Sequence, residues 1–232
     1  MNIYILIMIG VVFGYLFGSI PTALIISKGF YKIDIRKHGS GNLGSTNVNR
    51  TLGPKAGVIV MILDILKGGI PAFTMYKISE LIFLSNTELE NLLPYLSIIY
   101  CVTAIFTSIG HCYSIFAKFK GGKAVACICG FLLFMNFKLF LVGIIVYALG
   151  IIISKMVSVG SISAAVLVFL VSFIPWFNES YLFRHDELSN PTSFLIYRIT
   201  IIFLALLLII KHIPNIIRII KGTESKVIKN KK

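Results

Sequence analysis

Long apolar runs alternate with short polar stretches along almost the whole chain. Seven runs can be distinguished, at residues 3–27, 56–76, 92–109, 124–137, 139–154, 161–177 and 194–210. Most of them are long enough to cross a hydrocarbon core of about 30 Å as an α-helix. The pattern therefore predicts an all-α integral membrane protein built as a seven-helix bundle.

The fourth and fifth runs are the shortest, and their arrangement is left open by the sequence. The fourth has only 14 residues, so it needs a tilted helix or a locally thinned bilayer, or it merges with the fifth into one re-entrant element. A tight hairpin of two crossings is the other arrangement. The first run is too long for the apolar part of a signal peptide and follows no basic leader, so we expect it to remain as a mature span.

Composition agrees with a membrane protein. Of the 232 residues, 57% are hydrophobic and only 13% are charged, which is more apolar surface than a soluble core of this size can bury. No internal repeat interrupts the pattern, so residues 1–232 are expected to form a single membrane domain.

Basic residues gather in the stretches that would lie on one side of the bilayer. Loops 28–55 and 109–123, the turn 155–160 and the tail 211–232 hold 17 of the 22 lysines and arginines but only two acids. We expect the protein in the inner (cytoplasmic) membrane. Because lysine and arginine accumulate in cytoplasmic loops, its amino terminus is expected outside and its carboxyl terminus in the cytoplasm. This placement explains the net charge of +13 without a nucleic-acid partner.

The loop after the first run, DIRKHGSGNLGSTNVNRTLG at 34–53, is rich in hydrogen-bond donors. Glycines let backbone N–H groups converge, and arginine can hold a phosphate with two hydrogen bonds. The loop matches neither a P-loop nor a dinucleotide fingerprint, and an ordinary flexible loop is the alternative. The candidate phosphate-binding residues are Arg36, Gly39, Ser40, Gly41, Asn42, Ser45, Thr46, Asn47 and Arg50.

A second loop, GHCYSIFAKFKGGKAVAC at 110–127, joins a histidine to a Lys-Gly-Gly-Lys turn before the next apolar run. A glycine pair that leads into a helix can present free N–H groups to an anion. Membrane anchoring by the lysines is the alternative. The candidates here are His111, Lys120, Gly121, Gly122 and Lys123; for His111 a structural or substrate-orienting role is favoured over that of a general base.

Four further polar residues and one charged pair lie at or inside the apolar runs. Ser158 and Ser161 begin the sixth run, and His212 and Asn215 share one helical face if the last run continues inward. Asp64 and Lys67, at i and i+3, suit either a functional role or mutual neutralisation. The four cysteines form no CxxC pair, so neither a metal-binding nor a disulfide role is expected for them.

Several motifs together resemble the bacterial acyl-phosphate:glycerol 3-phosphate acyltransferases, the PlsY family. They are GSIP at 18–21, DIR and GSGNLGSTNVNR within 34–50, FKGGK at 119–123, SVGSI at 158–162 and NIIRIIKGTE at 215–224. The resemblance implies a seven-helix enzyme that moves a fatty acyl group from acyl phosphate to the 1-hydroxyl of glycerol 3-phosphate without a cofactor. We expect the protein to be a monomer. It implies catalytic roles in one polar pocket for Ser40, Arg50, Lys120, Ser158, His212 and Asn215. Pro214 departs from the family pattern.

A transporter of phosphate or phospholipid is the main alternative, because basic loops and a buried Asp64–Lys67 pair would also suit a transported anion. Transporters of this kind are commonly built from inverted repeats, and none is evident. A purely structural membrane protein would leave the donor-rich loop unexplained. The sequence therefore favours an enzyme.

Overall fold

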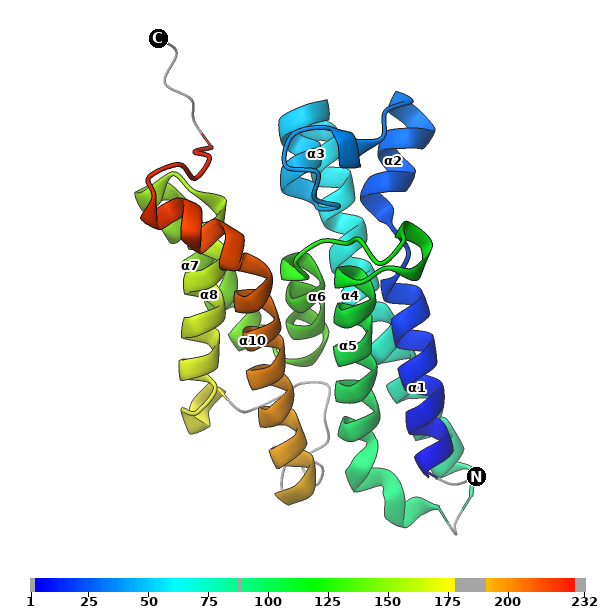
Figure 1. The fold of residues 1–232 in the computed structure, drawn as a ribbon. Coiled ribbons are helices and arrows are strands. Elements are labelled where there is room, and N and C mark those ends of the chain that lie inside the picture. Colours follow the sequence, from blue (N-terminus) through cyan, green and yellow to red (C-terminus); the bar gives the residue numbers. More distant parts are fainter. Residues whose placement is uncertain (1–2, 87–88, 178–190, 228–232) are drawn as a thin grey trace.

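The computed structural model describes residues 3–86, 89–177 and 191–227, and in these ranges the regular secondary structure is entirely helical (Figure 1). The α-helices are α1 (Ile3–Gly18), α2 (Thr22–Tyr31), α3 (Ser45–Leu52), α4 (Pro54–Leu84), α5 (Leu96–Cys112), α6 (Val125–Met135), α7 (Phe137–Ser154), α8 (Val157–Val171) and α10 (Pro191–Ile220). Short 3-10 helices lie at η1 (Ile35–Lys37), η2 (Glu90–Tyr95), η3 (Ile115–Ala117) and η4 (Pro175–Phe177).

Within the described residues, five helical stretches are long and apolar enough to cross a membrane. They are Ile3–Tyr31, Pro54–Leu84, Asn91–Ala117, Phe137–Ser154 and Pro191–Ile220. Two further apolar helices, α6 and α8, are shorter. Large apolar side chains cover the outside of the bundle, as lipid contact requires. The prediction of an all-helical membrane protein is confirmed, whereas in the part of the chain that the structure describes five of the seven predicted runs have the length of a full span.

The first apolar run was expected to form a single span, but its helix is not continuous. It is interrupted between α1 and α2, where Pro21 has no N–H to continue the hydrogen-bond ladder. The Lys67 ammonium on α4 donates to the Ile20 carbonyl at 2.9 Å and lies 2.8 Å from the Asp64 carboxylate. Thr22 donates to the same carboxylate at 2.5 Å. The buried pair therefore holds the break against α4, which is the structural role considered for it.

Helix α1 packs against α5 through glycines on one face. Gly10, Gly14 and Gly18 are four residues apart, and a Cβ on Gly14 or Gly18 would collide with the backbone carbonyl of Thr103 or Thr107. Small residues at this spacing let two membrane helices approach closely. The two threonine hydroxyls bond to carbonyls of their own helix, at 2.7 and 2.8 Å, so no polar hydrogen is left unsatisfied at this contact.

Helices α6 and α7 form a hairpin with Asn136 as the single residue between them. The Asn136 side chain accepts a hydrogen bond from Leu139 N–H at 3.0 Å, which caps α7, and donates to the Phe177 carbonyl at 2.7 Å. With 11 residues, α6 is about 16 Å long and cannot cross the hydrocarbon core, whereas the 18 residues of α7 give about 27 Å. The hairpin is therefore one span and one partial span.

The last helix continues beyond its predicted end at residue 210 to Ile220. Its final part, drawn in orange to red in Figure 1, runs at an angle to the rest, near Pro214; a proline inside a helix removes one hydrogen bond and kinks the axis. The predicted tail is described as far as Val227. Helix α3, the loop before α6, the turn between α7 and α8 and the end of α10 all lie at one end of the bundle (Figure 1).

Candidate active site

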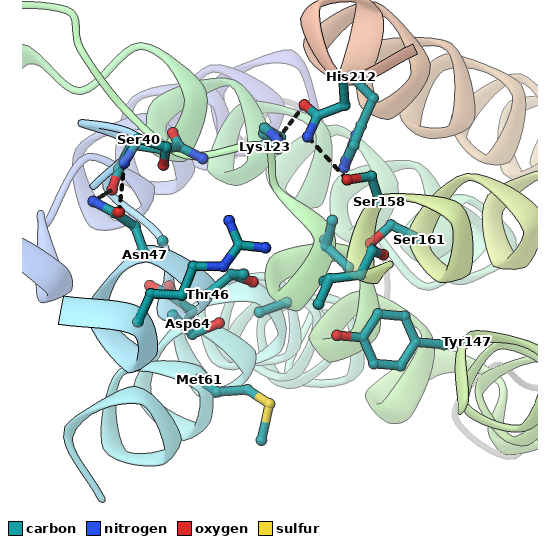
Figure 2. Close-up of a pocket in the computed structure, with 18 of the residues that line it drawn as sticks. Ser40, Thr46, Asn47, Met61, Asp64, Lys123, Tyr147, Ser158, Ser161 and His212 are labelled. Carbon is teal, nitrogen blue, oxygen red and sulfur yellow. Dashed lines mark hydrogen bonds between the residues drawn. The ribbon is translucent and has the colours of Figure 1, made fainter. Parts of the chain in front are cut away.

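A cavity of about 480 Å³ opens at this end of the bundle, with walls from α3, α4, α6, α7, α8 and α10 (Figure 2). Among its lining residues are thirteen of the candidates identified in the sequence: Gly39, Ser40, Asn42, Ser45, Thr46, Asn47, Arg50, His111, Lys123, Ser158, Ser161, His212 and Asn215. Segments that are far apart in the sequence thus meet around one space. The chemical roles of these residues stay predictions.

The first loop is shaped by one buried side chain. Asn47 accepts a hydrogen bond from Ser40 N–H at 2.8 Å and donates to the carbonyls of His38 and Asn42, both at 3.1 Å. Gly39, at φ +58°, leaves no room for a Cβ beside the same side chain. Since every polar atom of the Asn47 amide is taken by the loop backbone, Asn47 organises the loop and offers little to a ligand.

Three helices begin at the cavity, and none has a side-chain cap. Ser45 and Thr46 are the first residues of α3, Val125 is the first of α6, and Val157 and Ser158 are the first of α8; all five line the cavity. The first N–H groups of a helix have no partner within the helix, and its amino-terminal end carries a partial positive charge. The cavity is therefore suited to anions from three sides.

Opposite α3, a network of side chains joins the second loop to α8 and α10. The Lys123 ammonium donates to the Asn215 amide oxygen at 2.5 Å, as Figure 2 shows. The Asn215 amide nitrogen donates to Ser158 Oγ at 2.9 Å and to Glu224 at 2.7 Å. Ser158 also donates to Glu224, and Arg218 Nε donates to its other carboxylate oxygen at 2.7 Å. Glu224 thus fixes three groups at once.

The charges of this network are set by burial and by one another. Burial alone would raise the pKa of Glu224, but hydrogen bonds from Ser158, Asn215 and Arg218 outweigh it and lower this pKa. Burial lowers the pKa of Lys123 to about 8, assisted by nearby cations such as Arg218 and opposed by Glu224. Lys123 is therefore a cation at neutral pH and loses its proton as the pH rises through about 8.

Arg50 lies across the cavity from this network. Its guanidinium has no carboxylate partner within the described ranges, and its hydrogen bond to the Ser225 carbonyl is long, at 3.4 Å. The segment after α10 is also tied to the turn before α8, because Val227 N–H donates to the Lys155 carbonyl at 2.7 Å. Arg50 is thus a cation that a bound anion could engage without first breaking an ion pair.

The two candidate histidines lie in different settings. His212 Nδ1 is 2.8 Å from the Leu208 carbonyl; since a carbonyl only accepts, Nδ1 carries the proton and Nε2 is the free nitrogen. His111 is packed against Gly122, where a Cβ would strike its ring, and its Nδ1 is 3.7 Å from the Asp64 carboxylate. His212 is therefore the histidine better placed to accept a proton.

Five sequence candidates lie outside the set that lines the cavity. Arg36 forms two hydrogen bonds with Asp34, at 2.9 and 2.6 Å, so its guanidinium is already occupied. Gly41 supplies a positive φ of +70°, and Gly121 and Gly122 bring the second loop against the backbone and ring of His111. Lys120 is exposed on the surface. The glycines act here through their lack of a side chain.

The lining also includes residues that were not among the site candidates, and four of them are Arg218, Glu224, Asp64 and Tyr147. Arg218 and Glu224 stand in the segment NIIRIIKGTE, where a charged pair at the end of an apolar helix was a usable signal. Asp64 had been noted only as an intramembrane charge and lies at the cavity wall as well. Tyr147 carries the one polar side chain of α7 between Lys138 and Ser154, and hydrophobic periodicity does not mark a residue of this kind.

A second, apolar cavity of about 60 Å³ continues from the first between α6, α7, α8 and α10. Its deeper walls are aliphatic and aromatic, with Leu132, Val168 and Leu204 among them. The two cavities share four lining residues, namely Val125, Cys129, Tyr147 and Ser161. A polar, anion-suited space is therefore joined to an apolar groove.

Comparisons with known proteins agree with one another. The family model described as Glycerol-3-phosphate acyltransferase matches residues 8–222. Glycerol-3-phosphate acyltransferase 2 of Bacillus anthracis is 41% identical over 98% of this chain and 100% of its own length. The Bacillus subtilis enzyme is 39% identical over 96% of this chain and 98% of its own length.

Two solved structures are similar as well. They are crystal structures of PlsY, an integral membrane glycerol 3-phosphate acyltransferase, in its glycerol 3-phosphate and lysophosphatidic acid forms. Both are 31% identical to this chain and cover 95% of it and 94% of their own chains, with TM-scores of 0.76 and 0.74.

Proposed function

This chain belongs to the glycerol-3-phosphate acyltransferase family of PlsY type, and we propose that its pocket transfers a fatty acyl group from acyl phosphate to the 1-hydroxyl of glycerol 3-phosphate. The products are lysophosphatidic acid, a precursor of phospholipids, and inorganic phosphate. One observation carries the proposal of this donor: the anion-suited cavity continues directly into an apolar groove. An acyl phosphate has the same two parts, a phosphate head and an apolar tail.

The cavity has positive groups for two phosphates. Arg50 and the amino-terminal end of α3 form one group, and Lys123 with the amino-terminal ends of α6 and α8 forms the other. We assign glycerol 3-phosphate and the head of acyl phosphate to these groups. Binding both anions at once requires charge from opposite walls, since two phosphates repel each other at short distance.

The reaction asks the protein for orientation and charge stabilisation. An acyl phosphate is a mixed anhydride and already activated, so a nucleophile from the protein is not required. The hydroxyl proton passes to a substrate phosphate or, second in order, to Nε2 of His212. Ser40, Ser158 and Asn215 orient the substrates by hydrogen bonds. Lys120 lies on the exposed surface, where it attracts anionic substrates towards the cavity.

The orientation in the membrane follows from the basic loops. The end of the bundle that carries the cavity faces the cytoplasm, the amino terminus faces outside, and the protein acts as a monomer. A single added cysteine at Lys226 tests this arrangement, with the unsubstituted chain as the control, because Cys129 is partly exposed whereas Cys101, Cys112 and Cys127 are buried. An impermeant thiol reagent should label position 226 only after cells are opened; labelling of intact cells would contradict the orientation.

The donor is tested with purified protein in vesicles. Glycerol 3-phosphate is supplied with palmitoyl phosphate in one reaction and with palmitoyl-CoA in another, and phosphate release and lipid product are followed. We expect both products with palmitoyl phosphate alone. Product from palmitoyl-CoA would contradict the donor, and movement of glycerol 3-phosphate into the vesicles without lipid product would favour the transporter.

A further inference from the structure

The reacting carbonyl of an acyl phosphate lies between its phosphate and its alkyl tail. If the phosphate occupies the polar cavity and the tail the apolar groove, as the proposed function requires, the carbonyl lies where the two spaces meet. Four residues line both spaces: Val125, Cys129, Tyr147 and Ser161. A group that stabilises the charge developing on the carbonyl oxygen should be found among them.

Three of the four side chains are poor candidates for this task. The valine has no polar atom, and the thiol of Cys129 is a weak donor. The Ser161 hydroxyl donates to the Val157 carbonyl at 3.0 Å, so its hydrogen is already used within α8. Tyr147 remains as the strong side-chain donor at the junction.

The placement of Tyr147 is unusual for its helix. Between Lys138 and Ser154 it is the only residue of α7 with a polar side chain. Its ring is half-buried, and Figure 2 shows its hydroxyl directed into the cavity near Ser161. Within the described residues this hydroxyl has no hydrogen-bond partner. The hydroxyl is therefore available to donate a hydrogen bond to a group bound at the junction.

We propose that Tyr147 is a further catalytic residue, whose hydroxyl donates a hydrogen bond to the carbonyl oxygen of the acyl phosphate. The first N–H groups of α6, at Val125, border the same junction. Together they form an oxyanion hole with one side-chain donor and one helix end.

Acyl transfer proceeds by addition to the carbonyl followed by loss of phosphate. The 1-hydroxyl oxygen of glycerol 3-phosphate bonds to the carbonyl carbon, and the π electron pair moves onto the carbonyl oxygen, which Tyr147 then stabilises. When the carbonyl re-forms, the bond from carbon to the bridging phosphate oxygen breaks and phosphate leaves. The hydroxyl proton ends on phosphate, and Tyr147 keeps its own proton throughout.

The test is Tyr147→Phe, which removes only the hydroxyl. We expect kcat to fall about 100-fold, the loss typical of removing one oxyanion donor, while KM for both substrates stays within about threefold. Tyr15→Phe is the matched control, because the Tyr15 hydroxyl donates to the Tyr113 carbonyl at 3.0 Å outside the cavity; its kcat should stay within about twofold. Thermal unfolding of each variant is followed in the same detergent.

A second measurement separates transition-state stabilisation from packing of the acyl chain. Hexadecyl phosphate has the head and tail of the donor but no carbonyl, so it should inhibit the wild type and Tyr147→Phe equally. An unchanged kcat in Tyr147→Phe, or a loss of inhibitor affinity as large as the loss of kcat, would overturn the inference. A wild type that does not use palmitoyl phosphate would instead refute the proposed function, so the two failures are distinguishable.

Discussion

Arg50 is the clearest case in which a single residue can be assigned a chemical task. Its guanidinium faces the cavity without a carboxylate partner in the described part of the chain. We therefore expect it to bind a substrate phosphate with two parallel hydrogen bonds. Arg50→Lys keeps the charge but loses this geometry, so kcat/KM should fall roughly ten- to a hundredfold, in proportion to one lost charge-assisted hydrogen bond. Arg50→Ala should lose more.

Lys55 provides the control for Arg50, since it is exposed at the start of α4 and does not line the cavity. Exposed charges of this kind contribute little, and Lys55→Ala should leave turnover within about twofold. Equal damage from both substitutions would mean that the loop acts through bulk positive charge, without a specific phosphate contact.

The lowered pKa of Lys123 predicts how the affinity for substrate depends on pH. Its pKa is lowered to about 8, so the cation is present below this pH and is lost above it. KM for the substrate whose phosphate Lys123 binds should therefore rise as the pH increases past about 8. Lys123→Arg should shift this rise to higher pH, because arginine stays protonated, whereas Lys118→Arg on the exposed surface should not. A KM profile that is the same in wild type and Lys123→Arg would count against a role for this charge.

At the residue level, the sequence predicted which residues lie at the site better than it predicted their hydrogen-bond partners. Ser158, His212 and Asn215 were expected at the site and line the cavity. Arg36 was expected with them, but Asp34 lies two residues away and holds it. Asn47 was expected to bind ligand, but its amide is used by the loop. The sequence shows which side chains can donate hydrogen bonds. It does not show which of them will bond to the backbone or to a neighbouring side chain instead of a ligand.

At the element level, the contact between α1 and α5 depends on glycine. A Cβ at Gly14 would collide with the backbone carbonyl of Thr103, which can move only if the helices separate. Gly14→Ala should therefore destabilise the protein by about 1–3 kcal/mol, in the range of overpacked cores, seen as a lower Tm in detergent. Gly29→Ala is the control, since nothing lies within 4 Å of its added Cβ. A Tm of Gly14→Ala equal to that of wild type would refute the close approach.

Hydrophobic periodicity did not predict where two of the helices begin or end. The break before Pro21 lies inside an uninterrupted apolar run, and its stability depends on Lys67, far away in the sequence. Helix α10 continues for ten residues beyond the apolar run because His212 and Asn215 face the cavity, where polar side chains are solvated without lipid contact. Both features are set by tertiary contacts.

For the whole molecule, Glu224 connects the end of the chain to the bundle. It accepts hydrogen bonds from Asn215 and Arg218 at 2.7 Å and from Ser158. Glu224→Gln removes the ion pair and replaces an acceptor with a donor. We expect both a Tm lower by several degrees and a loss of kcat, because the groups that it holds also line the cavity.

Lys226→Ala is the control for Glu224, since this residue of the same segment is exposed. If Glu224→Gln lowers Tm but leaves kcat at the wild-type value, the segment after α10 serves stability alone and the cavity does not depend on its position.

The helices of this bundle have very different lengths, and this has a consequence for the lipid around them. Helices α4 and α10, with 31 and 30 residues, are about 45 Å long, whereas α8, with 15 residues, is about 22 Å long. Hydrophobic mismatch of this kind is relieved by thinning of the adjacent leaflet. The apolar groove lies beside α8 and α6, so thinning there would bring lipid head groups down to the depth of the cavity. Bilayer thickness depends on the fatty chains of phospholipids, and these are the chains that the enzyme transfers. We therefore expect the access of the acyl donor to the cavity to depend on the chain length of the surrounding lipids.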